Sequence, residues 1–149
     1  MKVAIISDHS GIEFRKEIIS FLEEKGYEVL DLGTDKEKDN YALKGIMVAE
    51  NVKMKAADFG IAICGTGIGI SIAANKIRGI RCALVSTNDQ ARLAREHNDA
   101  NIIALGAREI DVKDACTFVE TFLTTKFEGG RHSLRVDTIT DYEKSCIDC

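Results

Sequence analysis

Residues 59–75 read Phe-Gly-Ile-Ala-Ile-Cys-Gly-Thr-Gly-Ile-Gly-Ile-Ser-Ile-Ala-Ala-Asn. The apolar run 59–64 leads into a glycine-rich turn, and apolar residues continue at helical spacing over 67–75. A short, continuous apolar run is typical of a strand buried on both faces, as in a parallel sheet. The stretch therefore predicts a strand, a tight turn and a helix, which is the repeating unit of α/β proteins.

The same alternation continues along the whole chain. Further strands are predicted over residues 3–7, 27–32, 81–86 and 101–105, with helices over about 12–25, 41–55, 89–96 and 112–124 and a charged terminal helix from Arg131. Five strand–helix repeats predict a doubly wound, five-stranded parallel sheet with right-handed crossovers. The 149 residues fit a single domain, 1–149, whose last residues, about 140–149, are expected to be poorly ordered.

Composition and charge exclude several classes of protein. The formal net charge is −4 with no basic run, which argues against a nucleic-acid binder. The apolar run at the N-terminus is too short for a signal peptide, and no stretch approaches the ~20 apolar residues of a membrane span, so a cytoplasmic protein is expected. Among five cysteines, Cys82 and Cys116 are expected to be small buried hydrophobes, and the terminal pair Cys146 and Cys149 part of an unordered tail rather than a zinc or redox site.

The turn after residue 64 is a candidate anion site. Gly65, Gly67 and Gly69 let backbone N–H groups converge at a helix N-terminus, which can hold a phosphate or an oxyanion. The spacing fits neither the dinucleotide-binding pattern nor the P-loop, so nucleotide binding is not supported, and the glycines could simply permit a tight turn. The Cys64 sulfur should face this loop, where helix amides can favour a reactive thiolate, and Thr66 could add a hydroxyl.

In doubly wound sheets, ligands bind outside the carboxyl ends of the strands. This rule selects four loops, at residues 8–11, 64–69, 86–89 and 106–108. His9 and Arg108 lie in two of them, and Arg131 and Arg135 share one face of the terminal helix, where they could clamp a phosphate. His97 at a helix end could be a cap or a functional residue, and His132 is expected on the surface. No motif has metal-ligand spacing, so a mechanism without a metal is expected.

Four motifs together resemble ribose-5-phosphate isomerase type B, a family that also contains galactose- and allose-6-phosphate isomerases. They are Ser-Asp-His-Ser-Gly at 7–11, Cys-Gly-Thr-Gly-Ile-Gly-Ile-Ser-Ile-Ala-Ala-Asn-Lys at 64–76, Arg-Glu-His-Asn-Asp-Ala-Asn at 95–101 and Phe-Glu-Gly-Gly-Arg-His at 127–132. The resemblance implies a Rossmann-like fold and a homodimer or dimer of dimers with active sites at the dimer interface. It also implies cofactor-free interconversion of D-ribose 5-phosphate and D-ribulose 5-phosphate through a cis-enediolate, in the non-oxidative branch of the pentose phosphate pathway.

The resemblance also implies a role for each matching residue. Cys64 resembles the base that moves a proton between C1 and C2, and His97 the residue that assists ring opening, with Asp8 and Thr66 nearby. The remaining residues resemble substrate contacts: Gly65, Gly67 and Gly69 as the anion hole, Asn98 at the enediolate, His9, Arg108, Arg131 and Arg135 at the phosphate, and Tyr41 lining the site.

Some positions depart from the family pattern. Asn-Tyr-Ala stands at 40–42 instead of Asp-Tyr-Pro, Ile-Arg-Gly at 77–79 instead of Val-Pro-Gly, and 86–90 lacks an aromatic residue that many members have. These changes leave the preference for a five- or six-carbon sugar phosphate open. The alternatives are therefore an allose- or galactose-6-phosphate isomerase and, in a different class, a sugar-phosphate sensor without catalytic activity.

Overall fold

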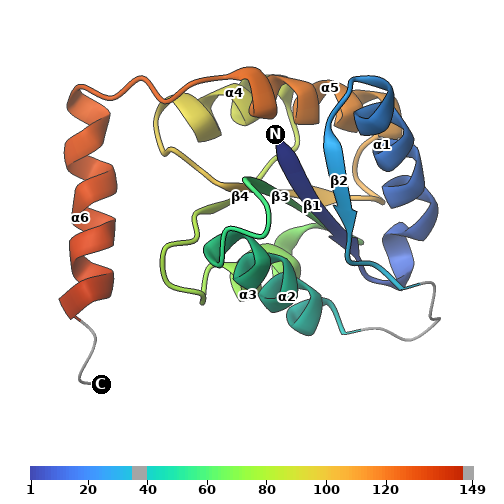
Figure 1. The fold of residues 1–149 in the computed structure, drawn as a ribbon, viewed down its shortest axis with the longest axis horizontal. Coiled ribbons are helices and arrows are strands. Elements are labelled where there is room, and N and C mark those ends of the chain that lie inside the picture. The colour runs from blue at the N-terminus through green and yellow to red at the C-terminus, as the bar shows by residue number, and fades with distance from the viewer. Residues whose placement is uncertain (35–39, 146–149) are drawn as a thin grey trace.

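Five parallel strands form the central sheet of the protein, in the order β2-β1-β3-β5-β4. The structure is a computed structural model that describes residues 1–34 and 40–145 (Figure 1). The strands are β1 Lys2–Ser7, β2 Glu28–Asp31, β3 Phe59–Cys64, β4 Cys82–Leu84 and β5 Ile102–Gly106. The helices are the short 3-10 turn η1 His9–Gly11, then α1 Ile12–Glu24, α2 Tyr41–Lys53, α3 Ile68–Ala74, α4 Asn88–Glu96, α5 Val112–Thr124 and α6 Arg131–Ser145.

Helices cover both faces of this sheet, as the alternating pattern predicts. Figure 1 shows α2 and α3 on one side and α1, α4 and α5 on the other. Alternate strand residues enter two separate cores: Ile61 and Ile103 pack with Phe122 of α5, whereas Ala62 and Ala104 pack with helices α2 and α3. Burial on both faces explains why the strands are continuously apolar instead of alternating.

The connections place a topological switch point between β1 and β3. The chain leaves β1 for β2 on one side and then crosses to β3 on the other. Ser7 pairs with Ile63, and Cys64 pairs with Gly106, so the carboxyl ends of β1, β3 and β5 lie side by side. The loops that follow these three strands therefore converge at the carboxyl end of the sheet.

Close packing of α2 on α3 positions the helix that follows Cys64. At Gly45 of α2, a Cβ atom would lie 2.5 Å from the carbonyl oxygen of Ile70 and 3.0 Å from the Cβ of Ala73. Only glycine permits this approach of two helix backbones. The contact holds α3 against the body of the domain.

Within residues 1–34 and 40–145, the five strands and six α-helices confirm the predicted fold. The edge strands β2 and β4 are shorter than predicted, and Cys116 is half-buried, not fully buried. Helix α6 starts at Arg131 as expected, but it continues through residues 140–145, for which little order was expected. Cys146 and Cys149 lie outside the described residues. None of the helices in the described part of the chain has the length and hydropathy that a membrane crossing requires.

Candidate active site

The carboxyl ends of β1, β3 and β5 surround a cavity of about 480 Å³. We call the residues around it the cysteine half-site: Asp8, His9, Ser10, Tyr41, Cys64, Gly65, Thr66, Ile68, Gly69, Ile72 and Arg108. Three of the four loops selected from the sequence thus meet here. The fourth, 86–89, does not line the cavity, because β4 lies at the edge of the sheet beyond β5.

Cys64 lies at the base of this cavity and is 4% exposed. The backbone N–H of Gly67 donates to its Sγ at 3.2 Å. Gly67 caps α3 with a φ of +76°, and a Cβ there would lie about 3 Å from the backbone of Leu105 and Gly106. A side chain at residue 67 would therefore be strained and crowded, so glycine is required to bring this amide to the sulfur.

Asp8 and His9 enter the cavity from the end of β1. Asp8 is buried, and its Oδ1 accepts hydrogen bonds from the backbone N–H of Ser10 at 2.9 Å and from the Ser10 hydroxyl at 2.5 Å. The Asp8 N–H in turn donates to the carbonyl of Ile63 at 3.1 Å. This turn ties the loop to β3 and fixes His9 at the cavity wall.

Arg108 and Tyr41 approach the glycine turn closely. The Arg108 N–H donates to the carbonyl of Gly65 at 3.0 Å, and its guanidinium lies over Gly65, where a Cβ would be 3.3 Å from Nη1. The Tyr41 ring lies on Gly69 in the same way, 2.3 Å from where a Cβ would stand. The two glycines therefore make room for a cation and an aromatic ring at the mouth of the cavity.

A second cluster, which we call the histidine half-site, joins the end of α4 to the start of α6. It contains His97, Asn98, Glu128, Arg131, His132 and Arg135. The rings of His97 and His132 stack with centroids 4.0 Å apart and planes 9° apart. Glu128 Oε2 lies 3.8 Å from Nε2 of each ring. The Glu128 N–H also donates to the carbonyl of Glu96, which fastens the start of α6 to α4.

His132 is buried at 4% exposure, so the expectation that it lies on the surface is wrong. Arg131 Nε donates to its Nε2 at 3.3 Å, and Arg135 Nη1 lies 3.2 Å from its Nδ1. Burial is the main cause that lowers the pKa of His132, followed by the charge of His97. Glu128 opposes this shift, and Arg131 and Arg135 add weaker effects that lower the pKa. The ring is therefore held against protonation between two guanidinium groups.

Within one chain, the two half-sites lie at opposite ends of the strands. Cys64 ends β3, whereas the carbonyl of Asn101, four residues after His97, accepts from the N–H of Gly60 near the start of β3. About 13 Å of strand separates these two ends. The cavity beside Cys64 accordingly has none of His97, Asn98, Arg131 or Arg135 in its lining. One chain alone does not bring the predicted site residues together.

The described residues contain one group with donor atoms close enough for a metal ion, His97, Glu128 and His132. Two features oppose that use. The imidazole rings are stacked nearly parallel, so the in-plane lone pairs of their nitrogens do not converge on a common point. Arg131 and Arg135 also place positive charge directly beside His132. The arrangement suits an anion better than a cation.

Sequence reasoning missed Ser10, Glu128 and His132 as parts of these clusters. Ser10 follows Asp8 by two residues, a spacing typical of an Asx turn, and this signal was available. Glu128 and His132 carry no such local signal, because their positions depend on how α6 packs against α4.

Comparisons with known proteins show which family the chain is similar to. The family model described as Ribose/Galactose Isomerase matches residues 3–139. The chain is 44% identical to ribose-5-phosphate isomerase B of Escherichia coli, over 96% of this chain and 97% of that protein. A ribose-5-phosphate isomerase B structure from Clostridium thermocellum has a TM-score of 0.94 at 50% identity, covering 97% of this chain and 99% of that one. The Mycoplasma genitalium enzyme with bound ribulose-5-phosphate has a TM-score of 0.92 at 41% identity, covering 96% of each chain.

Proposed function

The chain belongs to the ribose/galactose isomerase family, and on this premise we propose that it interconverts D-ribose 5-phosphate and D-ribulose 5-phosphate. The relatives from E. coli and C. thermocellum are named ribose-5-phosphate isomerase B, and the M. genitalium structure contains ribulose-5-phosphate. The reaction needs no cofactor, because a single base can move the proton between adjacent carbons. In this proposal the enzyme works in the cytoplasm, in the non-oxidative pentose phosphate pathway.

The observation that carries the proposal is the Cys64 sulfur, which accepts the Gly67 N–H at the base of the cavity. An amide donor at that position can stabilise negative charge on the sulfur. Cys64 is then the base that takes the proton from C2 of the open-chain aldose and returns it to C1. Thr66 and the amides of Gly65 and Gly69 stabilise the enediolate oxygens. Gly69 lies in the first turn of α3, where backbone amides have no partner within the helix.

Ring opening requires an acid–base group, because ribose 5-phosphate is mainly a furanose. We assign this step to His97, assisted by Asp8, with Asn98 contacting the enediolate. Asp8 lines the cavity, whereas His97 and Asn98 belong to the histidine half-site. The assignment therefore needs both half-sites in one place.

The phosphate is assigned to the cationic groups of both half-sites. His9 and Arg108 lie in the cavity wall. Arg131 and Arg135 both face His132, and a neutral imidazole can accept a hydrogen bond at only one of its nitrogens. Guanidinium donors therefore remain available for a phosphate, which would add binding energy remote from the reacting carbons.

A second copy of this chain completes the site in our proposal. Because the half-sites lie at opposite ends of the strands, a homodimer can bring the histidine half-site of one chain to the cysteine half-site of the other. Two-fold symmetry would generate two such sites, and a dimer of dimers four. The exposed apolar side chains Leu134 and Tyr142 on α6, and Ile68 and Ile72 beside the cavity, are suited to that contact.

The deciding experiment is a direct isomerase assay with the purified chain. We expect turnover of D-ribose 5-phosphate with a higher kcat/KM than for D-allose 6-phosphate or D-galactose 6-phosphate. A preference for a six-carbon substrate would overturn the ribose assignment and support the alternative within the family. Binding of ribulose 5-phosphate without any turnover would instead support the sensor.

A further inference from the structure

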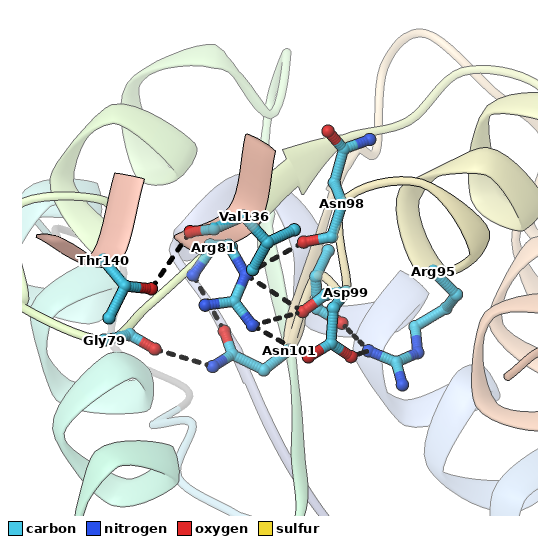
Figure 2. Close-up of polar contacts among 9 residues, drawn as sticks. Gly79, Arg81, Arg95, Asn98, Asp99, Asn101, Val136 and Thr140 are labelled. Carbon is cyan, nitrogen blue, oxygen red and sulfur yellow. Dashed lines mark hydrogen bonds and ion pairs between the residues drawn. The ribbon is translucent and has the colours of Figure 1, made fainter. Parts of the chain in front are cut away.

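Arg81, which immediately precedes β4, holds the turn that follows His97 (Figure 2). Its Nε donates to the carbonyl of Asn98 at 2.9 Å and to that of Asp99 at 3.1 Å. Its Nη2 donates to the same Asp99 carbonyl at 2.8 Å and to Asp99 Oδ2 at 3.0 Å. One guanidinium group thus binds two successive carbonyls and a carboxylate.

The turn held in this way has an uncommon backbone conformation. Asp99 has a φ of +43°, the left-handed region that non-glycine residues rarely adopt. Such a conformation persists only where the surroundings enforce it. A second guanidinium also holds the turn, since Arg95 Nη1 donates to Asp99 Oδ1 at 2.7 Å and to the carbonyl of Ala100 at 2.6 Å. The Asp99 carboxylate therefore bridges two arginines.

Packing alone does not fix this turn, because a cavity of about 420 Å³ lies next to it. Arg81 and Asn98 line the cavity on one side, and Ile139 and Glu143 of α6 on the other. A side chain or backbone segment beside empty space can shift without displacing a neighbour. The hydrogen bonds from Arg81 therefore act together with those from Arg95 and with the backbone bond from the Asp99 N–H to the Arg95 carbonyl in holding Asn98 beside His97.

The main chain beside Arg81 holds α6 through separate contacts. The Arg81 N–H donates to Asn101 Oδ1 at 2.9 Å, and Asn101 Nδ2 donates to the carbonyl of Gly79 at 2.8 Å. The Gly79 N–H donates to Glu143 Oε2 of α6 at 2.9 Å. These contacts use the backbone of residues 79–81 and not the guanidinium of Arg81. The side chain of Arg81 thus binds the turn that follows His97 and does not bind α6 directly.

We propose that Arg81 is a positioning residue that sets the orientation of His97 and Asn98 for the isomerisation, a role that rests on the proposed function. Lysine could not replace it, because one ammonium group lacks the planar fork that reaches both carbonyls and the carboxylate. Removing the guanidinium leaves the fixing of α6, with Arg131 and Arg135, intact. The inference therefore predicts a defect in kcat without a matching defect in KM.

The test compares Arg81→Gln and Arg81→Lys with Arg92→Gln as the control. Arg92 makes ion pairs with Asp89 and Glu96 on the surface of α4 and touches neither half-site. We expect both Arg81 variants to lower kcat about 10- to 100-fold, as a small misplacement of a reacting group does. KM should stay within about twofold, and Arg92→Gln should match the wild type.

A second measurement does not depend on activity. The chain has three histidines, so its imidazole resonances can be followed individually by NMR. In Arg81→Gln, the signals of the stacked pair His97 and His132 should shift, because ring-current effects depend on their stacking, whereas His9 should be unchanged. If Arg81→Gln does not fold, the same resonances are compared in Arg81→Lys, which keeps the positive charge but lacks the planar fork.

The outcomes separate the two proposals. An inactive wild type contradicts the proposed function, while the histidine spectra still report whether Arg81 orients the turn. Unchanged kcat and unchanged His97 resonances in an active, folded Arg81 variant would overturn the positioning role. A lowered melting temperature with wild-type kcat would also overturn it, since that pattern reports stability alone.

Discussion

Cys64 differs from the other described cysteines in what its sulfur contacts. Burial raises the pKa of Cys82 to about 12, so that thiol stays neutral in the interior. Burial and the nearby charge of Glu17 also raise the pKa of Cys116. The Cys64 sulfur instead accepts an amide hydrogen bond and faces a cavity that contains a guanidinium group. At the scale of single residues, this contact separates a candidate base from two structural thiols.

Replacing Cys64 with alanine should therefore abolish isomerisation while preserving ligand binding. Loss of a positioned acid–base group costs about 10²- to 10⁴-fold in rate, and we expect a fall in kcat at the upper end of that range. Affinity for ribulose 5-phosphate, measured by calorimetry, should change little because the cationic groups remain. Cys116→Ala is the matched control and should keep wild-type kcat. Substantial turnover by Cys64→Ala would remove the sulfur from the mechanism.

The buried His132 predicts a particular dependence of stability on pH. Because folding lowers its pKa below the usual 6.5, the unfolded chain binds more protons once the pH falls below that value. The contribution of His132 to stability is thus retained above about pH 6.5 and lost as the pH falls below it. In urea unfolding, the free-energy loss between pH 7.5 and pH 5.5 should be smaller for His132→Gln than for the wild type. An equal loss in both proteins would show that other groups cause the dependence.

At the scale of elements, the backbones of α2 and α3 approach each other closely at Gly45. Gly45→Ala should destabilise the protein although alanine normally favours a helix by ~1 kcal/mol over glycine. The added methyl would lie 2.5 Å from the Ile70 carbonyl oxygen, so the helices must separate. We expect a net loss of about 1–3 kcal/mol in the free energy of unfolding. Ser20→Ala, on the exposed side of α1, is the control: it tests helix preference without a clash and should leave the free energy of unfolding unchanged or raise it. A higher free energy of unfolding for Gly45→Ala would refute the close packing.

Most elements could be predicted from the sequence because each carries its own local signal. The continuous apolar runs of β1, β3 and β5 reflect burial on both faces, and their loops supplied the cysteine half-site. The lengths of β2 and β4 were harder to predict, because an edge strand pairs on one side only. The loop 86–89 was expected at the cavity and is not part of it, since sequence alternation does not give the order of strands.

The histidine half-site could not be predicted from local signals. Helix α6 is mostly polar, and within the described residues His132 and Val136 are its buried side chains. Its position depends on contacts with the end of α4 and with Gly79, which are distant in sequence. Family resemblance named His97, Arg131 and Arg135, but the stacking with His132 and the Arg81 network became visible only in the folded chain.

At the scale of the whole molecule, the separation of the half-sites becomes a prediction about assembly. If each site combines Cys64 of one chain with His97 of another, then Cys64→Ala and His97→Gln should complement each other. A mixed dimer would contain one site with both substitutions and one site with neither. Random mixing would make about half of the dimers mixed, so about a quarter of all sites would be intact. The two proteins, inactive alone, should together recover about a quarter of the wild-type activity after they are unfolded and refolded as a mixture.

The control for complementation mixes Cys64→Ala with a chain that carries both substitutions. Every site then lacks Cys64, so no activity should return, although mixed dimers still form. Differently tagged chains show by affinity capture that the mixed species is present, and light scattering gives its mass. If mixed dimers form from the two single variants without any activity, then each chain must build its own site. In that case, α6 would have to bring Arg131 and Arg135 to the carboxyl ends of the strands within one chain. The contacts that join α6 to α4 and Gly79 oppose such a movement.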